Sequence, residues 1–92
     1  MYYVYALFSK EDAKFYIGYT KNIQRRVREH ITGCNHTTLR YRRPQLVFFE
    51  AFLSEIDARR REKYFKTTKG RKALKLILRE TLTNKENICP VV

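Results

Sequence analysis

The sequence predicts a single α+β domain, in which three strands and about three helices follow one another along 92 residues. Three observations predict it. A chain of this length suits one small core. Two early stretches rich in Tyr, Phe, Val and Ile flank a polar turn, which is typical of a hairpin. Three later stretches carry apolar residues at helical spacing.

The two early stretches, 2–8 and 14–20, are predicted to pair as a hairpin around the turn 9–13. If the register matches their parities, Val4 and Ala6 share one face with Phe15 and Ile17. A third strand is predicted over 45–52. The opposite face of the hairpin then carries Tyr3, Tyr5, Tyr16 and Gly18.

The first helix is predicted to begin after Asn22 as its N-cap, to run to about Ile31 and to be ended by Gly33. A basic, irregular loop over 32–44 should follow. The second helix should begin at Ser54, which with Asp57 forms a capping pattern, and reach about Lys66.

A third helix is predicted after a break at 67–70. Residues 1–82 form the predicted domain, and 83–92 a polar C-terminal tail. The apolar stripe of this helix consists of Ala73, Leu74, Ile77, Leu78 and Leu82.

The net charge of +11 indicates a polyanionic partner. DNA is the favoured partner and RNA is not excluded, with affinity that falls as salt rises. An anionic membrane would require an amphipathic helix whose apolar face the core does not need, and the sequence offers none. Two cysteines, Cys34 and Cys89, are too few for a disulfide scaffold, which favours a reducing, cytoplasmic location.

Five side chains have the chemistry of phosphodiester cleavage: the phenols of Tyr5 and Tyr16, the Arg26 guanidinium, the His30 imidazole and the Glu62 carboxylate. Hydrolysis requires an activated water and neutralisation of the phosphate charge. Arginine suits the phosphate and histidine suits proton transfer. One carboxylate suffices for a hydrated divalent cation.

Each of these residues also has a structural interpretation. Strand tyrosines usually pack, and Arg26 and His30, four residues apart, could form a solvated basic helix face. Glu62 lies among arginines and lysines, so that an ion pair competes with a metal. Gly18 could mark a bulge or let the backbone approach a phosphate.

The order of these residues resembles that of the GIY-YIG nuclease family, which includes phage homing endonucleases, the N-terminal nuclease of the excinuclease and some restriction enzymes. The chain is most similar to the short stand-alone bacterial members. The signatures are Tyr3-Val4-Tyr5 and Tyr16-Ile17-Gly18, followed by the helix 20–30 and by residues 61–64. The resemblance covers about residues 1–75 and implies a three-stranded antiparallel sheet flanked by helices.

The resemblance also implies a role for each residue. Tyr5 would be the general base toward the attacking water, and Tyr16 a second phenol on the nucleophile or phosphate. Arg26 would clamp the transition state and His30 would assist proton transfer. Glu62 would hold one Mg²⁺ or Mn²⁺.

Two departures from the family pattern stand out. Tyr3 replaces the glycine of the first signature, which should narrow the approach to the strand edge. The later asparagine of the family has no clear counterpart, since Asn84 and Asn87 lie too far along the chain.

Basic and aromatic residues are expected to grip the nucleic acid, through backbone phosphates and through stacking of bases on Tyr41. No base-reading module is visible, so sequence preference should be low. The residues expected to bind nucleic acid are Gly18, Lys21, Arg25, Arg28, Arg40, Tyr41, Arg42 and Arg43.

The sequence therefore predicts a metal-dependent DNA endonuclease in repair or DNA processing, with selectivity for structured or single-stranded DNA. Two alternatives remain. One is a non-catalytic, basic nucleic-acid-binding module on the same fold. The other is a nuclease that works as a homodimer or within a larger repair assembly.

Overall fold

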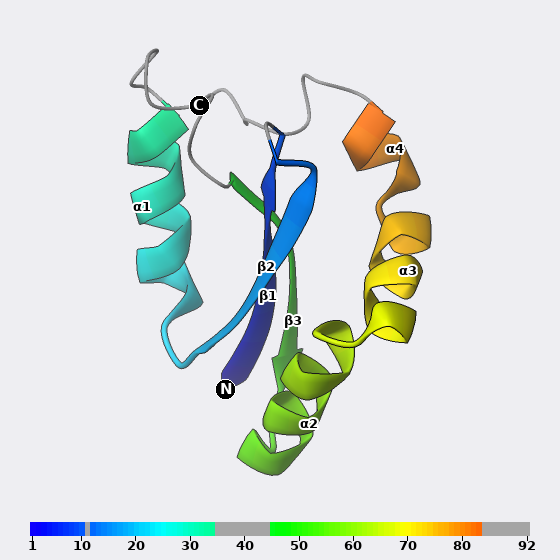
Figure 1. Cartoon of the computed structure of the whole chain (residues 1–92). Helices are drawn as coiled ribbons and strands as arrows, with labels where there is room; N and C mark the ends of the chain where they lie inside the picture. The colour runs from blue at the N-terminus through cyan, green and yellow to red at the C-terminus, as the bar shows by residue number, and fades with distance from the viewer. Residues whose placement is uncertain (11, 35–44, 84–92) are drawn as a thin grey trace.

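The molecule has three layers, with a sheet between one helix on one face and the remaining helices on the other (Figure 1). The computed structural model describes residues 1–10, 12–34 and 45–83. The sheet consists of β1 (Tyr2–Ser9), β2 (Lys14–Thr20) and β3 (Gln45–Phe52) in the order β2-β1-β3. Both pairings are antiparallel, which confirms the predicted α+β architecture with a three-stranded antiparallel sheet.

The hairpin register confirms the predicted division of the two faces. Tyr5 pairs with Gly18, Ala6 with Ile17 and Leu7 with Tyr16. Because side chains alternate along a strand, Tyr5 and Tyr16 project from one face of the sheet and Ala6 and Ile17 from the other.

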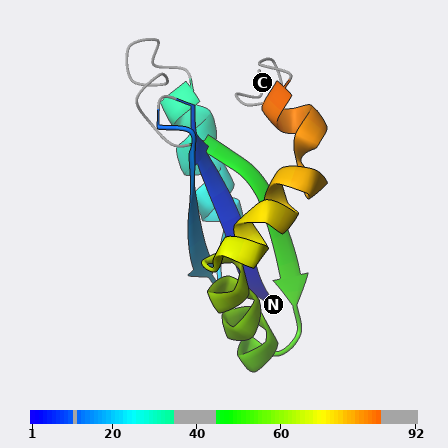
Figure 2. The ribbon, with the colours of Figure 1, turned by 45° about the vertical axis from the view of Figure 1, so that its right-hand side comes forward.

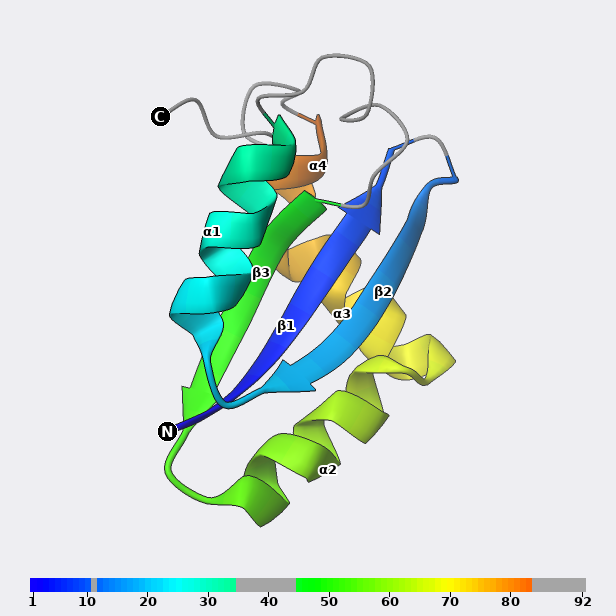
Figure 3. The ribbon, with the colours of Figure 1, turned by 90° about the vertical axis from the view of Figure 1, so that its left-hand side faces the viewer.

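Helix α1 (Ile23–Cys34) covers the face that carries Tyr5 (Figure 3). The side chain of Asn22 accepts a hydrogen bond from the Arg25 N–H at 3.0 Å, which confirms Asn22 as the N-cap. The predicted end at Gly33 is wrong, since the helix continues through Gly33 to Cys34. No described glycine has a positive φ, so Gly33 does not adopt the left-handed conformation that ends many helices.

Helix α2 (Glu55–Phe65) begins where the capping pattern predicts, with the Ser54 side chain accepting from the Asp57 N–H. The predicted third helix is two helices, α3 (Thr68–Ile77) and α4 (Arg79–Thr83), separated at Leu78. Figure 2 shows α2 and α3 following one another across the second face of the sheet.

The core lies between this second face and the helices α2 and α3. Leu74 and Leu78 are buried there as predicted, but Ile77 is wrongly assigned to the apolar stripe, since half of its surface is exposed. The break at Leu78 interrupts the helical periodicity on which that assignment depends. The buried cluster consists of Val4, Ala6, Phe15, Ala58, Phe65, Leu74 and Leu78.

The start of α3 lies against the end of α2. The Thr67 side chain caps α3 by accepting from the Gly70 N–H at 3.0 Å. A Cβ at position 70 would overlap the Tyr64 carbonyl and the Phe65 backbone, so only glycine permits this contact between the helices. Within the described ranges, no helix has the length and apolar character that crossing a membrane requires.

Candidate active site

The phenol of Tyr5 lies directly over Gly18. A Cβ at position 18 would overlap the Cζ and hydroxyl of Tyr5, so the glycine leaves the space that the ring occupies. The ladder between β1 and β2 continues without irregularity past Gly18, and the one shift in the β1–β3 ladder lies at Ala6 and Leu7. Gly18 therefore does not mark a bulge.

Arg26 of α1 also lies against the Tyr5 ring. Its guanidinium carbon is 5.1 Å from the centre of the ring, within the range of a cation–π contact. Both side chains are half-buried. The contact joins residues 21 positions apart in the sequence and places a permanent positive charge beside the phenol.

Tyr16 projects from the same face but has a different partner. Its hydroxyl donates to Asp12 Oδ2 at 3.2 Å, and the same oxygen accepts from the Ser9 hydroxyl at 3.3 Å. Ser9 is buried and also accepts from the Asp12 N–H, so the carboxylate is held within the β1–β2 turn. Tyr16 is thereby tied to the turn that precedes its own strand.

The environment of Tyr16 keeps its proton in place. Partial desolvation raises the pKa of the phenol, and so do the negative charge of Asp12 and the hydrogen bond to it. Each of these effects disfavours the phenolate. Tyr16 is consequently suited to donate a hydrogen bond rather than to accept a proton.

Tyr3, which replaces the glycine of the first family signature, lies toward the opposite edge of the sheet. Its ring meets Phe49 of β3 edge to face, with the centroids 6.2 Å apart. Since β2 and β3 flank β1 on opposite sides, the ring lies away from the strand that carries Tyr16 and Gly18.

Four other predicted site residues lie near Arg26 along the chain, within α1 or just before the helix begins: Lys21, Arg25, Arg28 and His30. His30 is one turn beyond Arg26 on α1, in the part of the helix whose backbone alone is described. Lys21, Arg25 and Arg28 are exposed, and the Lys21 ammonium lies 5.8 Å from the centre of the Tyr2 ring. Four residues that were expected to bind nucleic acid lie outside the described ranges: Arg40, Tyr41, Arg42 and Arg43.

Glu62 comes from α2, which packs against the second face of the sheet. It lies four residues after Ala58 and three before Phe65, both buried, so its side chain leans toward the sheet and is only 15% exposed. The preceding residue, Arg61, pairs with Glu50 of β3 at 2.8 Å. Successive helix positions diverge by about 100°, which puts Glu62 on the opposite flank, toward β2.

The same flank of α2 holds a cluster that ties it to β2. The Tyr19 hydroxyl donates to Glu55 Oε2 at 2.8 Å, and the guanidinium carbon of Arg59 lies 3.7 Å from the centre of the Tyr19 ring. Partial desolvation, the hydrogen bond to Glu55 and its charge raise the pKa of Tyr19 to about 12. Arg59 is thus held between β2 and α2.

Each carboxylate oxygen of Glu62 faces a cation from its own helix. Arg59 lies 3.6 Å from Oε1, and Lys66 lies 3.4 Å from Oε2. The ion-pair interpretation of Glu62 is therefore realised. Both cationic side chains are about half exposed, so water and competing ions have access to them.

The donor chemistry of Glu62 fits a single hydrated Mg²⁺ or Mn²⁺. Such ions take hard oxygen ligands and keep several waters, so one carboxylate at a site that already draws cations suffices. Within the described residues, no three His, Cys, Asp or Glu side chains form a metal-binding group.

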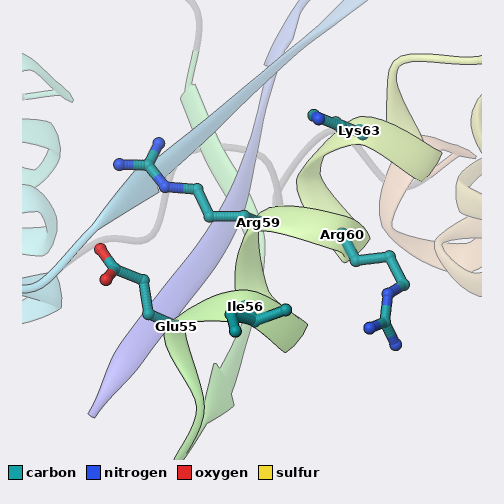
Figure 4. A pocket seen from close by; sticks show the side chains of 5 residues that line it. All are labelled: Glu55, Ile56, Arg59, Arg60 and Lys63. Carbon is teal, nitrogen blue, oxygen red and sulfur yellow. The ribbon is translucent and has the colours of Figure 1, made fainter.

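A shallow hollow of about 550 Å³ lies on the outer side of α2, apart from Tyr5 and Tyr16 (Figure 4). Its side chains diverge: the Arg59 guanidinium extends toward the sheet, while Arg60 points away from it. Arg60 pairs instead with Asp57 at 3.6 Å. The hollow lacks convergent polar groups and is not a substrate pocket.

Two partners of the predicted residues were not expected from the sequence: Asp12, which bonds to Tyr16, and Lys66, which pairs with Glu62. Arg59 is one of the arginines that were expected to compete with a metal for Glu62. The helical pairs were visible as spacings of three and four residues from Glu62, at which helix side chains meet. Asp12 lies four residues before Tyr16 across a turn, and that spacing alone indicates no contact.

The comparisons with known proteins confirm the family resemblance. Residues 1–75 match the model of the GIY-YIG catalytic domain. A UPF0213 protein of Clostridium perfringens is 38% identical over 78 residues, which cover 84% of this chain and 83% of that protein. A UPF0213 protein of Natronomonas pharaonis is 41% identical over 81 residues, covering 87% and 94% of the two chains.

A solved structure is similar over the whole chain. The solution NMR structure of a UPF0213 protein from Bacillus halodurans is 30% identical, with a TM-score of 0.53. The match covers 98% of this chain and 100% of that one.

Proposed function

The chain belongs to the GIY-YIG catalytic domain family, and on that premise we propose that it is a metal-dependent endonuclease that hydrolyses DNA phosphodiester bonds in repair or DNA processing. The family is nuclease-like, so the coarse class follows from membership. The observation that carries the finer proposal is the stack of Arg26, Tyr5 and Gly18, which joins the first helix to both signature strands.

In this proposal Tyr5 first gives its own proton to solvent beside the Arg26 guanidinium and then, as the phenolate, takes the proton of the attacking water. Arg26 neutralises the phosphate. The guanidinium lies 5.1 Å from the phenol ring, so one phosphate could be approached by both groups. A guanidinium also matches the geometry of phosphate oxygens. His30, one turn further along α1, would return a proton to the departing oxygen.

Tyr16 has the complementary role of a hydrogen-bond donor. The pKa of its phenol is raised by desolvation and by Asp12, so the proton stays on Tyr16 when Tyr5 gives up or accepts one. Its hydroxyl could then turn from Asp12 to a phosphate oxygen. The two phenols on one face would therefore differ in function because of their different neighbours.

Glu62 would hold the cofactor, one Mg²⁺ or Mn²⁺. Such an ion, when bound, supplies positive charge to the phosphate oxygens and acidifies a bound water. The carboxylate lies on the flank of α2 that faces β2, on the face of the sheet opposite to Tyr5 and Tyr16, so in this proposal the phosphate lies at the β2 edge, where groups from both faces can approach it. Glu62 would orient the ion.

The net charge and the exposed cations of α1 support a nucleic-acid substrate. Lys21, Arg25 and Arg28 are exposed beside the Arg26 site, and the whole chain carries +11. Binding should weaken steeply as salt rises, because phosphate contacts release counterions.

The test is cleavage of supercoiled plasmid and of single-stranded oligonucleotides in Mg²⁺ or Mn²⁺. Arg26→Ala and Glu62→Ala should each lose at least about a hundredfold in rate, the scale of a lost transition-state contact. Arg60→Ala, which removes an equal charge from an exposed residue paired with Asp57, should cleave like the wild type. Equal activity in all four proteins would overturn the assignment.

The ion pairs of Glu62 favour one alternative, a basic module that binds nucleic acid without cutting it. If Arg59 and Lys66 neutralise the carboxylate permanently, Glu62 cannot serve as the ligand of a divalent cation. Salt-sensitive binding with no cleavage of DNA or RNA in either metal would establish this alternative.

A further inference from the structure

Glu62 is bracketed by two cations that are held in different ways. Arg59 lies 3.6 Å from Oε1, and its guanidinium also stacks on the Tyr19 ring at 3.7 Å. Tyr19 is in turn bonded to Glu55, one turn before Arg59 on α2. Arg59 is thus held by a second element of the fold. A planar guanidinium stacked on an aromatic face is stabilised in that position by the cation–π contact.

Lys66 approaches Glu62 from the other end of the helix. Its ammonium lies 3.4 Å from Oε2 and forms an i, i+4 pair at the C-cap of α2. The side chain is 54% exposed, as that of Arg59 is at 53%, but in the described part of the chain its ammonium has no contact with a second element, so this pair exchanges more easily. A lysine ammonium is a compact point charge whose stem can swing into water without disturbing the backbone.

From this asymmetry we propose that Lys66 occupies the position from which a divalent cation binds Glu62, while Arg59 holds the carboxylate in place. The inference rests on the proposed function, in which Glu62 is the metal ligand. Lys66 keeps Oε2 oriented when no metal is present, and it moves into solvent when the ion binds. The ammonium therefore competes with the metal and sets its affinity.

The competition follows from charge. A single positive charge 3.4 Å from a carboxylate oxygen stabilises the carboxylate and repels a second cation that approaches the same oxygen. Replacing Lys66 by a neutral side chain of similar length removes both effects. Lys63 offers a matched control, because it lies one turn before Lys66 on the same helix, lines the outer hollow and is not a partner in the ion pairs of Glu62.

The experiment is Mn²⁺ binding to the full chain without DNA, followed by the electron paramagnetic resonance signal of the free ion. Lys66→Gln should bind Mn²⁺ about three- to tenfold more tightly than the wild type, the effect of removing a partly screened neighbouring charge. Lys63→Gln, with the same change of net charge, should stay within about twofold of the wild type. Equal affinities in these two variants would overturn the proposal.

Two further variants separate the possible failures. Glu62→Gln should abolish the Mn²⁺ binding that depends on this carboxylate. If it binds Mn²⁺ like the wild type, Glu62 is not the ligand and the metal assignment of the proposed function fails. Arg59→Gln should gain less affinity than Lys66→Gln, because the loss of repulsion is offset by a less ordered carboxylate. Equal gains would show that the two cations are equivalent and would overturn the division of roles.

Discussion

The phenol of Tyr5 occupies the space that a side chain at position 18 would fill, so the second strand of the hairpin determines where the first strand can place its tyrosine. The two residues face each other directly in the register. The Arg26 guanidinium carbon lies 5.1 Å from the centre of the same ring. The position of this phenol thus depends on a residue that has no functional group.

The first prediction is that Gly18→Ala lowers cleavage by more than about tenfold, since a displaced catalytic group costs this much or more. The overlap is with the end of the Tyr5 side chain and not with backbone, and no described glycine has a positive φ. The protein should therefore fold and its thermal midpoint change little. The measurement is cleavage rate beside thermal unfolding followed by circular dichroism.

The control for this prediction is a double-mutant cycle with Tyr5→Phe. If Gly18 acts through the Tyr5 hydroxyl, adding Gly18→Ala to Tyr5→Phe should cause no further loss. Additive losses would mean that Gly18 acts on the substrate directly.

The second prediction concerns the phenol of Tyr16. Asp12→Asn removes the charge that, together with desolvation, raises the pKa of Tyr16, so the pKa should fall toward its ordinary value. The titration can be followed by NMR of the ring carbons of Tyr16. Glu80→Gln, an equal change of charge on α4, should leave it unchanged; a similar fall in that variant would assign the effect to net charge.

The third prediction concerns stability in alkali. The pKa of Tyr19 is about 12 in the fold, above the ordinary value of 10.0. A raised pKa contributes stability that is fully present below pH 10.0, where the unfolded phenol is still protonated, and is lost as the pH rises through about 12. The free energy of unfolding of the wild type, measured with urea, should therefore fall over this window. It should fall less in Tyr19→Phe.

Glu55→Gln tests the cause of that loss, because Glu55 accepts the Tyr19 hydrogen bond at 2.8 Å. It should bring the pKa of Tyr19 down and move the loss of stability to lower pH. Asp57→Asn removes a charge from the same helix but leaves the Tyr19–Glu55 bond intact. An equal effect of both variants would contradict the assignment to Glu55.

The strands and most helix starts follow from the sequence because they depend on local signals. The alternation of side chains along the strands predicts that Tyr5 and Tyr16 share a face of the sheet. The capping residues Asn22 and Ser54 predict where α1 and α2 begin. The end of α1 and the break at Leu78 were not predictable, since helix ends depend on tertiary contacts and on weak competing signals.

The partners within the site were harder to predict than its members. Residue types and order indicate that Tyr5, Arg26 and Glu62 have suitable chemistry, but not what each one touches. The Arg26 contact with Tyr5 joins a helix to a strand, and the Arg59 contact with Tyr19 does the same on the other face. Such contacts depend on how the helices cross the sheet, which no spacing in the sequence encodes.

The fourth prediction concerns the junction of α2 and α3. In an ordinary helix, glycine to alanine stabilises by about 1 kcal/mol. At position 70 the added Cβ would overlap the Tyr64 carbonyl and the Phe65 backbone, which cannot move aside as a flexible side chain does. Gly70→Ala should therefore destabilise the fold by about 2 kcal/mol or more, as overpacking does, measured by urea unfolding. Lys69→Ala, at the exposed neighbouring position, should change stability by less than about 0.5 kcal/mol. A Gly70→Ala protein more stable than the wild type would show that the helices can separate at no cost, and that this glycine does not determine how they pack.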